Sequence, residues 1–198
     1  MINKVFFILS ILNFSLLFSQ TKKNKLSIDS ITVQMKKSEG LINTFLKNNK
    51  LYFEINNSVL NKELLMVTRF SQFPGDYSSY VNAGSKTAEN IISFKLKDNK
   101  IVLEKLAYTN EASDQDPIQI SVIKNNFPPI LAVFKIENTE KDRFLIDVSS
   151  YFMNDSPGFN LIRKSDKESF KIGSVDKERS FIDNANSFLN NTEIKNTL

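Results

Sequence analysis

The feature that most constrains the fold of this chain is a series of paired apolar runs, each pair joined by a short polar turn. The first pair, residues 41–46 and 51–55, flanks the sequence Lys-Asn-Asn-Lys at 47–50. Asn tolerates the left-handed backbone conformation that tight hairpins require, so this segment predicts a β-hairpin.

Two further segments repeat this arrangement. Residues 92–97 alternate apolar and polar side chains, turn at 98–100 and return along 101–108. Residues 130–152 form another apolar pair around the polar tip 138–142. Alternation with period two is typical of strands, so both segments predict antiparallel hairpins.

The segments between the hairpins are shorter and less regular. Residues 30–35 predict a short strand, and Asn57 or Ser58 can cap a short helix. Residues 64–70 are apolar on both faces, which favours a central strand. Residues 117–126 fit either a strand or a short helix that ends at the double Pro.

Near the C-terminus the pattern changes. Phe181, Ala185 and Phe188 have helical spacing, and Asp176 can serve as the N-cap, so residues 176–191 predict a helix. The last residues alternate as a strand does, with no Gly, Pro or charged tail to close them. We therefore expect a strand that starts here and a sheet that is completed by a C-terminal part outside this chain.

The expected fold class is mainly β (α+β), an antiparallel sheet of several hairpins with one or two short helices. An apolar fraction of 41% with 17 Phe residues is enough to close a core. The expected organisation is a signal peptide at 1–19, a flexible basic leader at 20–37, an antiparallel β-rich domain at 38–175, and at 176–198 a helix and the start of a strand.

The N-terminus has the pattern of a secretory signal peptide. Lys4 precedes an apolar run at 5–18, and Ser19 is small enough to stand before a cleavage site that leaves Gln20 as the new N-terminus. The run is short for a membrane span and carries polar residues. We expect a secreted or periplasmic protein without membrane association after cleavage.

The composition excludes several kinds of chemistry. The chain has no His and no Cys, so it offers no imidazole ligand or base, no thiol nucleophile and no thiolate metal site. The net charge of +4 is small, and nucleic acid is not an expected partner. No catalytic, metal or cofactor-binding residue is assigned in this chain.

Two loops are candidate binding sites. Three carboxylates within 111–116 could hold Ca²⁺, but the EF-hand spacing is missing, which favours a solvated loop. Tyr77, Tyr80 and Asn82 lie in a long polar loop, where aromatic and amide side chains could hold a sugar or a peptide. An ordinary loop, with its aromatic rings packed on the sheet, is the more common case.

Several stretches, in this order, resemble a known family. They are GLINTFLKNNKLYFEINNSVLNKELLMVTRF, NIISFKLKDNKIVL, FPPILAVFKI, FLIDVSSYF and DKERSFIDNANSFLNNTEIKNTL. Residues 38–198 thereby resemble the N-terminal region of large secreted bacterial zinc-dependent metallopeptidases of the zincin type, in which domains of unknown function precede the catalytic domain.

The resemblance implies a function and a partner. The family's catalytic helix carries H-E-x-x-H, whose two His bind zinc and whose Glu activates water. No position here can take those roles, so zinc is expected only in the catalytic part. The implied role is a non-catalytic N-terminal domain that supports folding or substrate framing of a catalytic domain in the same or an adjacent polypeptide. An independent secreted binding module for glycan or peptide remains the alternative.

Overall fold

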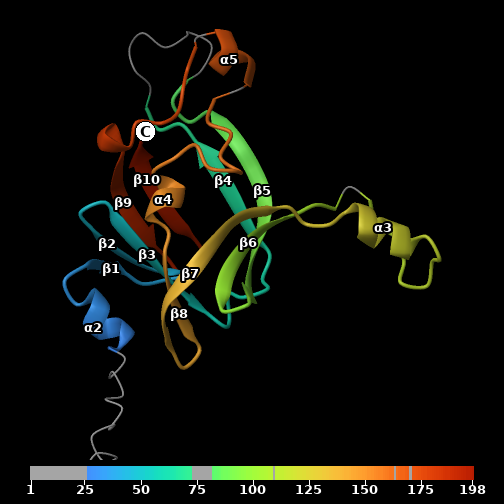
Figure 1. The fold of residues 1–198 in the computed structure, drawn as a ribbon, viewed down its shortest axis with the longest axis horizontal. Coiled ribbons are helices and arrows are strands. Elements are labelled where there is room, and N and C mark those ends of the chain that lie inside the picture. Colours follow the sequence, from blue (N-terminus) through green and yellow to red (C-terminus); the bar gives the residue numbers. More distant parts are fainter. Residues whose placement is uncertain (1–25, 73–81, 109, 163, 170) are drawn as a thin grey trace, which may run out of the picture.

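The computed structural model describes residues 26–72, 82–108, 110–162, 164–169 and 171–198. These residues form an eight-stranded antiparallel sheet, a separate two-stranded hairpin and a few short helices (Figure 1). The prediction of a mainly β, antiparallel fold is confirmed.

The strands of the large sheet follow the order β1-β2-β3-β8-β7-β6-β5-β4, and β9 pairs with β10. Their bounds are β1 (Lys36–Ser38), β2 (Asn43–Lys47), β3 (Lys50–Asn56), β4 (Leu64–Arg69), β5 (Lys86–Lys97), β6 (Lys100–Leu106), β7 (Ile130–Glu140), β8 (Arg143–Asp147), β9 (Phe181–Ser187) and β10 (Thr192–Thr197). The helices are α2 (Ile28–Thr32), α3 (Gln119–Asn125), α4 (Ser149–Phe152), α5 (Lys164–Ser169) and the 3-10 helix η1 (Lys177–Arg179).

The three predicted hairpins are present as β2–β3, β5–β6 and β7–β8. Asn48 and Asn49 turn the first with φ of 49° and 61°, and Asp98 and Asn99 turn the second with φ of 46° and 57°. Two consecutive left-handed residues give the tight turn whose twist matches that of the flanking strands.

The main core lies between one face of the sheet and two covering segments. Leu51, Phe53 and Ile55 of β3 are buried there. The β9–β10 hairpin contributes Ile182 and Ala185 to the same cluster, and it lies against β2 (Figure 1). The second covering segment runs from α4 into the following loop.

Aromatic side chains fill the part of the core under α4. Tyr151 has ring centroids of Phe134, Phe152 and Phe159 within 5.8 Å, and Phe53 packs on Phe152 at 5.6 Å. Tilted and edge-on rings of this kind pack favourably. The cluster fixes α4 where β8 ends.

The opposite face of the sheet is covered over β2 and β8 by α2. Ile28 is fully buried against Phe45 and Leu145, and the Ser27 hydroxyl caps the helix by accepting from the Ser30 amide at 3.1 Å. The short strand predicted at residues 30–35 was therefore wrong. The prediction of a flexible leader is also wrong from residue 26 onward, because a capped turn with one buried apolar face fixes this segment.

Two predictions for the region before β5 were wrong. The segment after Asn57 and Ser58 forms turns, because Asn61 has φ of 60° and interrupts any helix. The apolar segment 64–70 contains the edge strand β4, not a central strand. Leu65 and Val67 on its outer face are exposed, so the apolar run does not mark burial on both faces.

The helix predicted at residues 176–191 is replaced by η1 and the strand β9. Asp176 does act as an N-cap, but of the single turn η1, where it accepts from the Glu178 amide at 3.0 Å. Phe181 and Phe188, whose spacing suggested a helix, are half exposed. Pairing with β10 stabilises the strand instead, and the strand predicted at the last residues is confirmed.

Candidate functional site

The predicted ligand loop is only partly described. Tyr77 and Tyr80 lie outside the described residues. Asn82 is exposed, its amide donates to the Ser85 hydroxyl at 3.2 Å, and its carbonyl accepts from the Ser85 amide at 3.0 Å. Asn82 thus closes a turn before β5, and its part in ligand binding stays a prediction.

The acidic loop before α3 uses its carboxylates locally. Asp116 accepts from the Ile118 amide at 3.0 Å, and Asp114 accepts from the side-chain amide of Gln119. Among the residues that the structure describes, no group of three or more Asp or Glu side chains is placed to hold a metal ion. These contacts shape the entry into α3.

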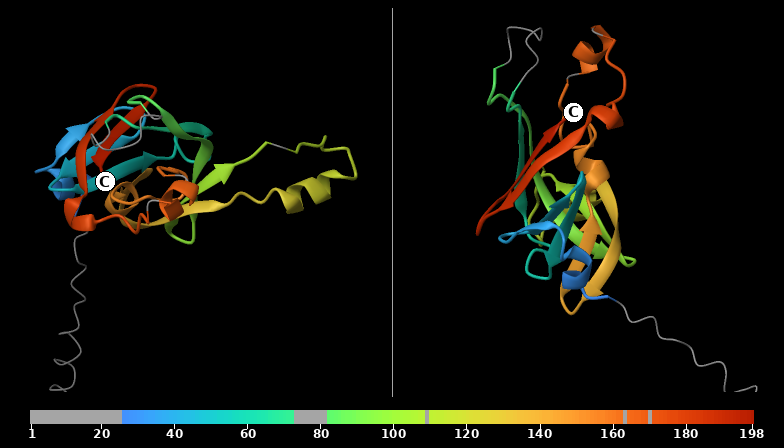
Figure 2. Two further views of the ribbon diagram at one scale, coloured as in Figure 1. Left: turned by 90° about the horizontal axis from the view of Figure 1, so that it is seen from above. Right: turned by 90° about the vertical axis from the view of Figure 1, so that its left-hand side faces the viewer.

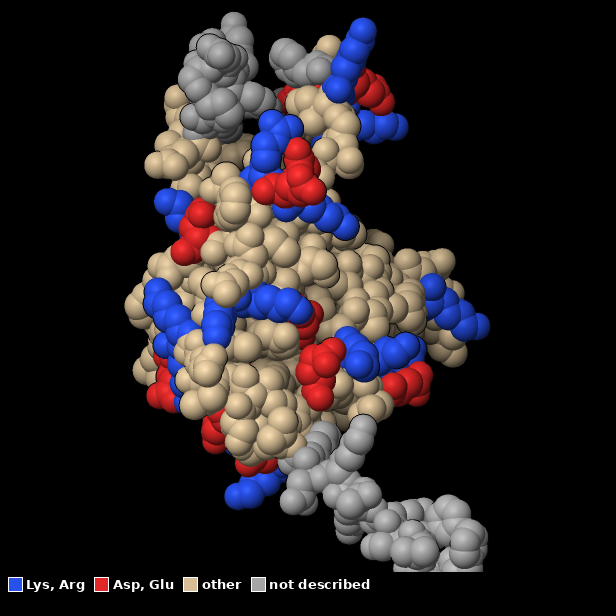
Figure 3. All heavy atoms as spheres, turned by 60° about the vertical axis from the view of Figure 1, so that its left-hand side comes forward, with Lys and Arg blue, Asp and Glu red and all other residues tan. Residues whose placement is uncertain are grey.

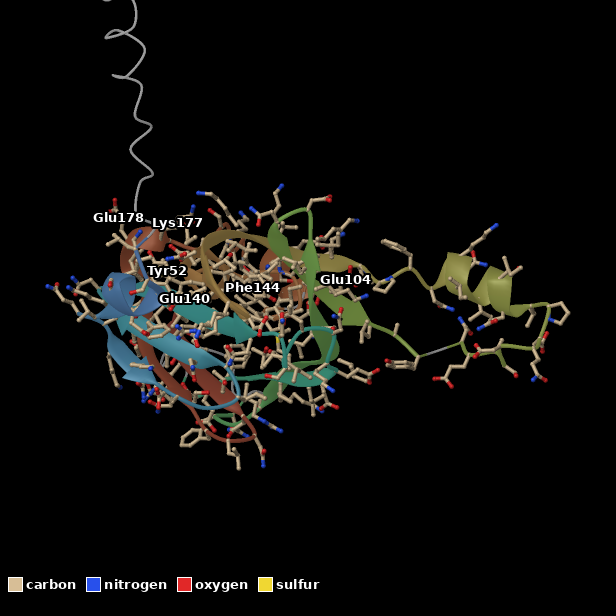
Figure 4. The ribbon with its side chains drawn as sticks, turned by 90° about the horizontal axis from the view of Figure 1, so that it is seen from below. Tyr52, Glu104, Glu140, Phe144, Lys177 and Glu178 are labelled. Atoms are coloured by element: carbon tan, nitrogen blue, oxygen red, sulfur yellow. The ribbon has the colours of Figure 1, made fainter. Side chains whose placement is uncertain are left out.

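A charge cluster around the buried Glu54, which the sequence does not reveal, attaches α2 to the sheet. Arg143 lies 3.2 Å from Glu54 and 3.1 Å from Glu140, and the Glu54 side chain is 3% exposed. Glu140 also accepts from the Ile28 amide at 3.0 Å, and Asn43 donates to Glu54 at 3.0 Å. Figure 4 labels Glu140 beside Tyr52 on this side of the body. Because these charges are paired with one another, the cluster holds structure together rather than offering a free acid or base.

The feature that stands apart from the body is the segment 107–129, here called the arm. It leaves the sheet between β6 and β7 and carries α3 at its far end (Figures 1 and 2). At its base the Lys105 amide donates to the Pro129 carbonyl at 3.0 Å. Asn110 and Asn126 join its two legs through side-chain contacts of 3.4 and 3.5 Å.

Several apolar side chains of the arm are exposed and do not pack on the body. Ile120, Ile123 and Phe127 are 64%, 63% and 72% exposed, and α3 has no buried residue. Ile120 and Ile123 are three apart and share a helix face, and Phe127 follows directly after the helix. Figure 4 shows the sticks of α3 standing clear of the body, and labels Glu104 on the half of the sheet from which the arm extends.

An exposed helix of this kind is unusual for an isolated domain. Helices shorter than about 12 residues are marginal in water unless an apolar face packs against something. Exposed apolar groups that cluster rather than scatter mark interaction surfaces. Among the described residues, the arm is therefore the candidate functional site, as a surface for interaction.

The face shown in Figure 3 has no patch of one charge sign among its described residues. On the face shown in Figure 3, Lys and Arg are interspersed with Asp and Glu, and neither sign forms a continuous patch. No described helix has the length and apolar character needed to cross a membrane.

The comparisons with known proteins define the class. Residues 84–198 match the model of a domain of unknown function, DUF5117, which covers more than half of the chain. The chain therefore belongs to the DUF5117 family. Residues 27–73 match a second domain of unknown function, DUF5118.

Neither of the other comparisons adds a relative. No curated protein and no solved structure matches this chain. The two matched segments nevertheless have a clear relation in the structure. The DUF5118 segment supplies β1–β3 at one end of the large sheet and β4 at the other, and the DUF5117 segment supplies β5–β8 between them.

Proposed function

We propose that this chain is a non-catalytic domain of a secreted zinc-dependent metallopeptidase, docked through the arm onto the catalytic domain. That catalytic domain, in the same or an adjacent polypeptide, would carry the zinc. The observation that supports docking most directly is the exposed apolar face of Ile120, Ile123 and Phe127. The choice of a catalytic domain as the partner is supported by the resemblance of residues 38–198 to metallopeptidase N-terminal regions.

The size of the arm's apolar surface suits a domain–domain contact. Burying an Ile or Phe side chain contributes about 1.5–3 kcal/mol relative to exposure. Burial of these three side chains in an interface would favour association and would also give the short helix the packing that it lacks. The signal-type N-terminus supports a secreted or periplasmic location, and the absence of His fits a supporting role.

The test uses the purified chain and the HExxH-containing catalytic domain encoded in the same or the neighbouring reading frame. Isothermal titration calorimetry measures their dissociation constant. The double variant Ile120→Asp/Ile123→Asp should weaken binding at least tenfold, because two apolar anchors become charged. Ser121→Asp is the matched control, since it adds a charge to an exposed polar position of the same helix.

The outcomes separate the alternatives. Unchanged circular dichroism in both variants shows that the body stays folded, as expected for side chains outside the core. Absence of binding by the unaltered chain would refute the proposed partner. Equal binding by the Ile120/Ile123 variant and the Ser121 control would refute the arm as the docking site.

A further inference from the structure

Strand β7 changes its neighbour halfway along its length. Residues 136–140 pair with β8, whereas residues 130–135 pair with β6. Strand β8 ends at Asp147, and the chain turns away into α4. Along residues 131–135, no strand therefore lies beside β7 on the side that faces away from β6.

The backbone of this edge has N–H and C=O groups that are available for hydrogen bonds. In an antiparallel pair, alternate residues direct both their N–H and their C=O away from the partner strand. Within the described part of the chain, residues 131–134 have no strand partner on the side away from β6, and no hydrogen bond from a turn, a loop or a side chain reaches their backbone. The position that a continued β8 would occupy is thus unfilled.

A hollow of about 340 Å³ lies next to this edge. Its walls come from β7 on one side and from α4 and the turn after it on the other, and they include Val133, Lys135, Glu137, Asp147, Tyr151 and Asn154.

Tyr151 gives this hollow a fixed, neutral wall. Its hydroxyl donates to the Pro157 carbonyl at 2.8 Å, and burial raises the pKa of Tyr151 to about 12. The charge of the hollow therefore depends on its carboxylates and its one lysine.

The charges along the hollow are unequal. Lys135 approaches Glu137 only to 3.8 Å and its side chain is 80% exposed, so it is free to swing away. Asp147 accepts from the Ser149 amide through one oxygen, and Lys50 lies 4.0 Å from the other. The lining itself contains two carboxylates and one lysine, and Lys50 stands outside it beside Asp147, so the lining has a small excess of negative charge.

We propose that this hollow binds an extended peptide segment with a basic side chain, which adds to the open edge of β7 as a short strand. Backbone groups of the edge pair with the peptide backbone, Val133 contacts an apolar side chain, and Glu137 and Asp147 attract the basic one. At about 3.3 Å per residue, the edge 131–135 accommodates roughly three to five peptide residues.

This site does not depend on the proposed docking of the arm, since it needs neither α3 nor a zinc enzyme. It also differs from the Tyr77–Tyr80 loop. An extended peptide suits the edge better than a sugar does, because its N–H and C=O groups recur with the strand's own period.

The test is an NMR titration of the chain with three synthetic heptapeptides. The first alternates Thr and Val around a central Lys, the second has a central Glu, and the third is the Lys peptide with alternate backbone N-methyl groups. The Lys peptide should shift the amide signals of residues 131–137. The Glu and N-methylated peptides should bind at least tenfold more weakly.

Two matched variants test the charge. Glu137→Lys should weaken binding of the Lys peptide at least tenfold and strengthen binding of the Glu peptide. Glu178→Lys makes the same change on η1, which Figure 4 shows on the side of the body away from α3, and should leave both affinities unchanged. The heteronuclear spectrum of each variant reports whether the fold is intact.

Three results would overturn the proposal. The first is the absence of shifts at 131–137 at millimolar Lys peptide. The second is equal binding of the N-methylated peptide, which would exclude strand addition. The third is a concentration-dependent shift of the same amides without peptide, which would assign the edge to a second copy of this chain.

Discussion

Gly40 shows how closely the β9–β10 hairpin approaches the sheet. The Leu41 amide donates to the Phe188 carbonyl at 2.7 Å. A Cβ on Gly40 would stand 2.6 Å from the Ser187 hydroxyl oxygen and nearer still to the backbone of Phe188. Only a residue without a side chain fits here.

We therefore expect Gly40→Ala to destabilise the protein. Backbone atoms of Phe188 cannot move aside as the end of a flexible side chain can, and overpacking typically costs about 1–3 kcal/mol. The midpoint of urea unfolding measures the loss. Gly173→Ala is the control, because nothing lies within 4 Å of a Cβ there, and an equal loss in both variants would contradict the close-approach explanation.

At the scale of elements, the turn of the β2–β3 hairpin also holds β9 in place. The side-chain amide of Asn49 donates to the Ser180 carbonyl at 3.2 Å, and its oxygen accepts from the Ile182 amide at 3.1 Å. Both bonds reach the chain just where β9 begins. The turn therefore links two elements that are far apart in the sequence.

Asn99 provides a close comparison for Asn49. Both residues have left-handed backbone conformations in hairpin turns, so replacement by Ala costs each the same kind of strain. Only Asn49→Ala also loses two hydrogen bonds, each contributing about 0.5–1.5 kcal/mol. Urea unfolding should show Asn49→Ala to be less stable than Asn99→Ala by about 1–3 kcal/mol, and equal stabilities would show that the link to β9 contributes nothing.

The hairpins could be predicted from sequence because their information is local. Alternating runs and Asn or Asp turns determine β2–β3 and β5–β6 without reference to the rest of the chain. The strand β9 could not be predicted, because its stability comes from β10 and from the distant β2. The edge position of β4 likewise depends on the order of strands and not on its own residues.

The candidate site was only partly accessible from sequence. The sequence of residues 117–126 is compatible with a strand or with a short helix, and the structure contains α3 there. The exposure of its apolar residues could not be predicted, because an apolar helix face usually packs against the core. The open edge of β7 depends on where β8 ends, which again is a property of the assembled sheet.

At the scale of the whole molecule, the two family segments form one sheet. Strand β3 from the first pairs with β8 from the second, and β4 pairs with β5. The core side chains Leu51, Phe53 and Ile55 come from the first segment and pack against side chains of the second. Neither segment holds a complete core.

We therefore expect residues 84–198 alone not to fold cooperatively. Removing β3 and β4 leaves two sheet edges unpaired and takes apolar side chains out of the core. Amide dispersion in NMR spectra and a thermal unfolding scan measure this. Co-expression with residues 26–83 should restore a single sharp transition, and a sharp transition in residues 84–198 alone would show that the two segments are separate domains.

The order of strands in the large sheet also affects the order in which strand pairs can form during folding. The neighbours β4, β5, β6, β7 and β8 follow one another along the chain and can pair early, and so can β1, β2 and β3, but the second edge of β3 has no partner until β8 has formed. Contacts between remote parts of a chain form slowly, because the entropy of closing a long loop is lost before the contacts stabilise the chain. The pairing of β3 with β8 is thus expected to form late, and until then the open edge of β3 is a surface that could pair with another chain.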